Sequence, residues 1–101
     1  MTRLVVTTDA DADFTDVVAY LQRKAGPRVA ANYGRRVKHT LERLVEFPQS
    51  AAPRPVLGPN ARIAIVSPYI PIYDYEPDVD TIVLLRILHE RRNITQDLVR
   101  R

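Results

Sequence analysis

The chain contains no cysteine and no tryptophan, and only three of its 101 residues are glycine. The absence of cysteine excludes disulfides and thiolate metal sites, and it makes a reducing compartment the simpler environment. No apolar run approaches the roughly 20 residues that span a bilayer, and the N-terminal apolar stretch is too short for a secretory signal. We therefore expect a soluble, cytoplasmic protein without membrane association.

Motifs for catalysis or metal binding are also scarce. The sequence contains no glycine-rich phosphate loop, and no pair of carboxylates in a likely cleft has a spacing useful for acid–base catalysis. The two histidines, His39 and His89, fall in different predicted elements, whereas a zinc site needs three or four ligands. The sequence therefore predicts neither a metal site nor a cofactor.

The length and the apolar share of 46% fit one small domain with a modest core. The net charge of +3 is unevenly distributed along the chain. Residues 23–43 hold seven lysines and arginines and one acid, and residues 86–101 hold five arginines and two acids. Two basic zones are typical of a surface for nucleic acid or an acidic protein, and equally of a solvated helix face and a charged tail.

The N-terminal half of the sequence predicts one strand followed by two helices. The short β-branched stretch at residues 3–8 is typical of a strand. Thr8 or Asp9 is then placed to cap a helix that ends at the AGP sequence of residues 25–27. A second helix ends near Phe47, and the short connection predicts an antiparallel helical hairpin. In the second helix we expect Ala30, Tyr33, Val37, Leu41 and Leu44 to be buried, and Arg35, Arg36, Lys38 and Arg43 to be exposed.

The C-terminal half predicts a proline-rich loop and three strands. The loop covers residues 48–61, and the strands cover about 61–66, 69–75 and 80–89, joined by tight turns at SP and EPDVD. Pro71 lacks an N–H group, so it predicts an irregularity or a locally unpaired edge in the middle strand. Residues 94–101 have little to bury, and we expect them to form a partly disordered, basic tail.

The last predicted strand, TIVLLRILH, carries an arginine among apolar residues. Because side chains alternate along a strand, we expect two faces, one with Val83, Leu85, Ile87 and His89 and the other with Ile82, Leu84, Arg86 and Leu88. The helical hairpin covers one face only, so the other is either covered by another segment or is the working surface. An unpaired buried arginine is costly, so Arg86 should meet an acid, for which Asp74 and Glu76 are the candidates, reach the open face, or contact a partner.

Several short motifs occur in a recognisable order. An LG pair precedes an arginine on the second predicted strand, a Y-x-x-x-Y strand follows, and the last strand reads I-x-x-x-R-I-x-H-x-x-R. The matching residues are Leu57, Gly58, Arg62, Tyr69, Tyr73, Ile82, Arg86, Ile87, His89 and Arg92. From about residue 4 to 93, the chain resembles the ParE branch of the ParE/RelE toxin family of bacterial toxin–antitoxin systems.

This resemblance implies an α+β fold of order β-α-α-β-β-β, with the N-terminal helical hairpin packed on a mainly antiparallel sheet. Residues 1–93 would form a single toxin domain, and residues 94–101 would follow it as the basic tail. Pro71 departs from the usual apolar residue or arginine of the family, and the long proline-rich loop is a variable feature. Neither departure changes the expected fold.

The resemblance implies two functions. A ParE-like toxin is not an enzyme: it poisons DNA gyrase by protein contact, causes growth arrest, stabilises plasmids and is held inactive by a cognate antitoxin. A RelE-like toxin cuts mRNA in the ribosome, which here would use Arg62, Arg86, His89 and Arg91. RelE-like enzymes usually have a lysine-rich approach to the second strand, whereas this chain has only Arg54 there, so the sequence favours the gyrase poison. A third alternative is an inactive remnant retained as a binding partner.

The resemblance and the charge pattern together give a set of candidate binding residues. Contacts with the target or partner are expected at Arg62, Tyr73, Tyr75, Arg86, His89, Arg91 and Arg92. The expected partners are an apolar, acidic antitoxin segment, which folds as a helix plus an added strand, and DNA gyrase. DNA would be bound only through the antitoxin, because the sequence has no helix-turn-helix signal.

Overall fold

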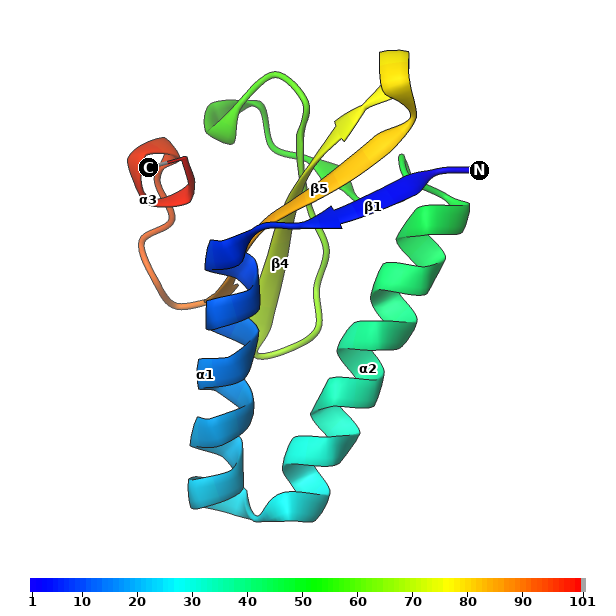
Figure 1. Ribbon diagram of the computed structural model, residues 1–101. Coiled ribbons are helices and arrows are strands. Elements are labelled where there is room, and N and C mark those ends of the chain that lie inside the picture. Colours follow the sequence, from blue (N-terminus) through cyan, green and yellow to red (C-terminus); the bar gives the residue numbers. More distant parts are fainter. Residues whose placement is uncertain (101) are drawn as a thin grey trace.

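The computed structural model describes residues 1–100, and it has two helices packed on one face of a five-stranded sheet (Figure 1). The helices are α1 (Thr8–Ala25) and α2 (Pro27–Glu46). This arrangement confirms the predicted α+β class and the helical hairpin. Within residues 1–100 no helix is both long and apolar enough to cross a membrane.

The sheet has the strand order β1-β5-β4-β3-β2, and only the pair β1–β5 is parallel. Its strands are β1 (Arg3–Val6), β2 (Ala52–Pro53), β3 (Ala61–Ile63), β4 (Tyr69–Glu76) and β5 (Thr81–His89). The proline-rich segment is more ordered than a plain loop, because it contains β2 and the 3-10 turn η1 (Pro55–Leu57). Both tight turns are present, at Ser67–Pro68 and at the 3-10 turn η2 (Pro77–Val79).

The junction between β1 and α1 lies one residue earlier than predicted. Thr7, rather than Thr8 or Asp9, caps α1, because its Oγ1 accepts a hydrogen bond from the Ala10 N–H at 3.1 Å. The same hydroxyl lies within hydrogen-bonding distance of the carbonyls of Leu84 (2.9 Å) and Leu85 (3.1 Å) on β5. One threonine thus starts the helix and fixes it to the sheet.

The second helix buries the face that its sequence predicted. Its buried residues are Ala30, Tyr33, Val37 and Leu44, with Leu41 partly buried, while Arg35, Arg36, Lys38 and Arg43 are exposed. Gly26 joins the two helices with a φ of 94°, a left-handed backbone conformation that glycine adopts without strain. From this turn the helices diverge toward β1 (Figure 1).

A β-bulge in the pairing of β4 with β5 overturns the predicted faces of the last strand. Ile72 pairs with Arg86 and Tyr73 pairs with Leu84, so Leu85 is an extra residue on β5. Because a bulge shifts the alternation by one residue, Ile82, Leu84 and Ile87 all face the helices, and Leu85 and Leu88 face away. Pro71 predicted an irregularity in this strand, and one is present close to it, because the register with β5 shifts between Ile72 and Tyr73.

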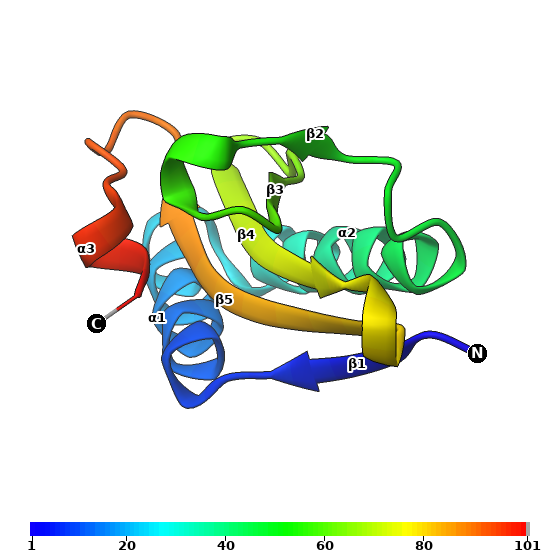
Figure 2. The same ribbon diagram turned by 90° about the horizontal axis from the view of Figure 1, so that it is seen from above.

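The sheet face opposite the two long helices is covered by the chain itself. A second apolar cluster there contains Leu57, Ala61, Ile63, Ile72, Leu88 and Val99, with Ile70, Leu85, Ile94 and Leu98 packed around it. Val99 belongs to the short helix α3 (Gln96–Val99), which lies beside η1 (Figure 2). The prediction of a partly disordered tail is therefore wrong for residues 94–100, because their apolar side chains cover this face. Arg101, the last residue of the predicted tail, lies outside the described residues.

Candidate functional site

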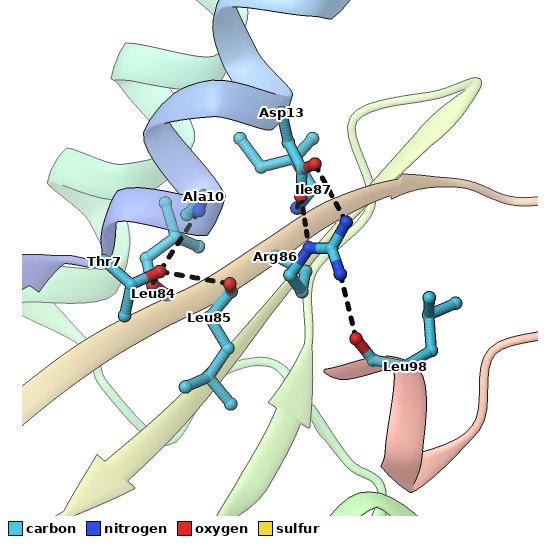
Figure 3. Close-up of polar contacts among 8 residues, drawn as sticks. All are labelled: Thr7, Ala10, Asp13, Leu84, Leu85, Arg86, Ile87 and Leu98. Atoms are coloured by element: carbon cyan, nitrogen blue, oxygen red, sulfur yellow. Dashed lines mark hydrogen bonds and ion pairs between the residues drawn. The ribbon is translucent and has the colours of Figure 1, made fainter. Parts of the chain in front are cut away.

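Arg86 is held by an ion pair inside the protein, and its partner is not the predicted one. Its Nε and Nη2 atoms donate to the two carboxylate oxygens of Asp13 on α1, at 2.7 and 3.0 Å (Figure 3). Its Nη1 atom donates to the Leu98 carbonyl at 2.8 Å. The hydrogen bonds with Asp13 raise the pKa of Arg86. The predicted pairing with Asp74 or Glu76 is wrong, because the first turns of α1 pass alongside this part of β5.

Asp74 has a different arginine partner, from the C-terminal segment. The Arg100 guanidinium donates to both carboxylate oxygens of Asp74, at 2.8 and 2.6 Å, and to the Leu57 carbonyl at 2.6 Å. Two arginines therefore hold α3 in place. Arg86 on β5 donates to the Leu98 carbonyl, and Arg100, which follows α3, donates to Asp74 on β4.

Arg62 and Tyr73 also make internal hydrogen bonds. Arg62 Nη1 donates to the carbonyls of Gln49 (2.9 Å) and Ala51 (2.7 Å). Tyr73 is fully buried, which raises the pKa of its phenol group, and it donates to the Pro48 carbonyl at 2.9 Å. Both side chains thus hold the segment that follows α2 against the sheet.

Tyr75 is engaged with a neighbouring turn. Its hydroxyl donates to Asp80 Oδ1 at 2.8 Å, and this hydrogen bond raises the pKa of Tyr75. The same carboxylate oxygen accepts a bond from the Thr2 hydroxyl at 2.8 Å. These two bonds, with the Thr2 bond as the larger effect, lower the pKa of Asp80. The contact ties the N-terminus to the turn between β4 and β5.

The other three predicted residues, His89, Arg91 and Arg92, form a separate group at the end of β5. The His89 Nδ1 atom accepts a hydrogen bond from the Arg91 N–H at 3.1 Å. The His89 ring packs edge-on against Tyr69, with ring centroids 5.3 Å apart. Arg91 and Arg92 are exposed. The structure thus brings these three predicted residues together in one group, apart from the pair Arg62 and Tyr73, which lie opposite each other on β3 and β4.

An apolar groove that the sequence analysis did not predict opens between α1 and α2 and extends to β1. Its volume is about 780 Å³. Leu4 and Val6 of β1, Phe14 of α1 and Leu41 of α2 contribute apolar side chains. Residues of both charge signs join the lining, namely Asp11, Arg35, Lys38 and Glu42. The apolar stripes of both helices were visible in the sequence, but the divergence of the helices that keeps the groove open was not.

Arg36 is a second residue whose position the sequence did not reveal. Its guanidinium lies 5.6 Å from the centre of the Tyr33 ring, and Nη1 donates to the Ser67 carbonyl at 3.3 Å. Tyr33 packs edge-on against Tyr69, with centroids 5.5 Å apart, and its hydroxyl donates to the Val66 carbonyl at 2.9 Å. A row of rings, Tyr33, Tyr69 and His89, therefore connects α2 to the end of β5.

Comparisons with known proteins agree with this architecture. Among solved structures, the chain is similar to one described as the chromosomal ParDE toxin–antitoxin system from P. aeruginosa, with a TM-score of 0.74 and 22% identity over 88% of this chain and 96% of that one. It is also similar to the RelBE2 toxin–antitoxin complex from Mycobacterium tuberculosis, with a TM-score of 0.58 and 23% identity over 87% of this chain and 96% of that one.

Two further comparisons used the sequence. A search of curated proteins found no match. The family model described as the ParE toxin of the type II toxin–antitoxin system parDE matches residues 4–94, which is nearly the whole chain. This chain therefore belongs to the ParE toxin family of type II toxin–antitoxin systems.

Proposed function

We propose that this toxin acts in the cytoplasm by inhibiting DNA gyrase through protein contact, and that a cognate antitoxin neutralises it. The observation that favours contact over catalysis is the position of the two strand arginines. Arg86 is paired with Asp13 and the Leu98 carbonyl, and Arg62 is bonded to two loop carbonyls. Both guanidinium groups already have structural acceptors.

The alternative, ribosome-dependent mRNA cleavage, would need different chemistry from these residues. A ribonuclease must move a proton at the 2′-hydroxyl and stabilise the negative charge that develops on the phosphate. Of the four candidates, only the half-buried His89 and the exposed Arg91 lie together. Arg86 would have to release acceptors from all three of its nitrogens, and Arg62 is oriented toward the loop by two bonds from Nη1. The arrangement therefore supports a contact surface better than a phosphate-cleaving site.

Substitutions at the end of β5 separate the two functions. The purified protein should inhibit gyrase supercoiling and should leave mRNA intact in a ribosome-dependent cleavage assay. His89→Gln should retain growth arrest and gyrase inhibition, because glutamine preserves a hydrogen-bond acceptor without a titrating group. Reversing the charges of both Arg91 and Arg92 to glutamate should abolish inhibition, because a complementary surface becomes repulsive. Loss of toxicity in His89→Gln, with folding and antitoxin binding intact, would favour the ribonuclease.

The apolar groove between α1 and α2 supports the proposal that a cognate antitoxin binds this toxin. The opposite sheet face is filled by α3 and η1, so it does not offer an open apolar surface to a partner. The groove offers apolar side chains with Arg35 and Lys38 among its lining. β1 ends the sheet on this side, and the structure describes no strand beyond it in residues 1–100. An amphipathic helix with acids placed beside Arg35 and Lys38, and away from Asp11 and Glu42, fits the groove, and an extended segment fits the edge of β1.

A single substitution tests whether the groove binds the antitoxin. Val6 lines the groove and is 47% exposed, so Val6→Asp should leave the melting temperature nearly unchanged. We expect its affinity for the antitoxin, measured by calorimetry, to fall by about tenfold or more, because a carboxylate would be desolvated against an apolar partner. The matched control is Val79→Asp, since Val79 is 67% exposed and lies outside the groove. Equal affinities for the two variants would place the antitoxin elsewhere.

A further inference from the structure

The turn after β5, residues 89–92, lies beside the turn at Ser67–Pro68, and Arg36 reaches the same turn from α2. The Glu90 N–H donates to the Pro68 carbonyl at 2.9 Å. Arg36 Nη1 donates to the neighbouring Ser67 carbonyl at 3.3 Å. Two cationic segments that are more than 50 residues apart in the sequence therefore flank one tight turn.

The cations around this turn are accessible to a partner. Arg36, Arg91 and Arg92 are all exposed. Arginine is, with tryptophan and tyrosine, among the side chains that most often contribute strongly to protein–protein binding. Two segments far apart in the sequence thus place such residues around the turn at Ser67–Pro68.

We infer that Arg36 and the exposed arginines Arg91 and Arg92 form one composite surface that contacts an acidic patch on the target protein. This inference rests on the proposed function and extends the surface beyond the end of β5. Arg36 is the new member of this surface, and it can be tested by substitution. Its contacts with the Tyr33 ring and the Ser67 carbonyl hold the guanidinium next to the turn. A pre-positioned arginine loses less conformational freedom on binding than a free one.

The composition of this surface favours a protein partner over a nucleic acid. Binding to single-stranded RNA relies on aromatic faces that stack on bases. Here Tyr33 and Tyr69 are buried, and the rings of Tyr33, Tyr69 and His89 pack edge-on against one another. The exposed Glu90, which precedes Arg91 in the sequence, adds a carboxylate that would repel a phosphate backbone. A surface with three arginines and one acid fits protein recognition better.

Charge reversal on α2 tests the inference. Arg36→Glu should raise the concentration needed for half-inhibition of gyrase by about tenfold or more, because an attractive contact becomes repulsive. The matched control is Arg43→Glu, which makes the same change two turns further along the same helix, at another exposed arginine. Arg43→Glu should inhibit like the unmodified protein. Arg36→Lys retains the charge and should recover most of the inhibition.

Three additional measurements make the result decisive. Melting temperature and antitoxin affinity report whether Arg36→Glu is folded, and the inhibition by the unmodified protein should weaken as salt concentration rises. Equal inhibition by the two glutamate variants would overturn the inference while leaving the gyrase proposal standing. If Arg36→Lys were as inactive as Arg36→Glu and both melted early, Arg36 would be a structural residue only. Growth arrest without gyrase inhibition would refute the proposed function, and binding of an RNA oligonucleotide that depends on Arg36 would replace the protein partner by RNA.

Discussion

Replacing Asp13 with alanine should lower the free energy of unfolding by about 3 kcal/mol, the lower end of the cost of removing one partner from a buried ion pair, because this pair remains partly exposed to water. The Asp13 carboxylate accepts two hydrogen bonds from Arg86 and a third from the Ile87 N–H at 3.0 Å. Both charged side chains are only 15% exposed, so water can replace these bonds only in part. For a domain of this size, the melting temperature should fall by roughly 12 to 24 °C.

Asp16 provides the control for this prediction, because it lies on the same helix and is exposed. Asp16→Ala should change the free energy of unfolding by less than about 0.5 kcal/mol, as is usual for surface substitutions. Chemical denaturation of both variants makes the comparison. Similar stabilities of the two variants would show that the bonds of Asp13 contribute little to the fold.

Replacing Val99 with aspartate should detach the C-terminal segment from the sheet. Val99 is 4% exposed and contributes to the second apolar cluster. A carboxylate at this position would have to be buried without a partner, and the alternative is release of α3 with loss of its apolar contacts. We expect the free energy of unfolding to fall by about 3 kcal/mol and a hydrophobic dye such as ANS to bind to the uncovered sheet.

The same new residue at an exposed position of α3 provides the comparison. Gln96→Asp introduces aspartate in the first turn of α3, where negative charge is favourable. It should neither bind the dye nor lower the stability by more than about 0.5 kcal/mol. If Val99→Asp bound no dye and kept the stability of the unmodified protein, the sheet face would not need this cover.

The sequence predicted the elements whose signals are local. The period of the apolar residues in α2 identified its buried side, and the prolines and Gly26 marked where helices and turns end. The second face of the sheet was harder to predict. The bulge at Leu85 depends on how β4 and β5 pair, and it shifted the faces of the residues after Leu85. No pattern within nine residues of one strand specifies this shift.

The contacts of the predicted site residues depend on even longer distances along the chain. Arg86 meets an aspartate 73 residues away, and Arg36 meets a carbonyl 31 residues away. Because twelve acids were available in the sequence, charge pairing by proximity favoured Asp74 and Glu76, whereas the structure pairs Asp74 with Arg100. The exposure of Arg91 and Arg92 could be predicted from the sequence, because both arginines follow the end of an apolar strand.

The shortness of β1 leaves part of β5 without a strand neighbour on that side. β1 pairs only with Thr81 to Leu84, and beyond that point the Thr7 hydroxyl and the Asp13 carboxylate occupy the backbone groups of Leu85 and Ile87. An unpaired strand edge is a template on which further chains can add, and this is a common route to aggregation. The start of α1 therefore covers the part of the β5 edge that β1 leaves unpaired. Local melting of these turns would expose that edge before the rest of the protein unfolds, so the resistance of the protein to self-association depends on the start of α1.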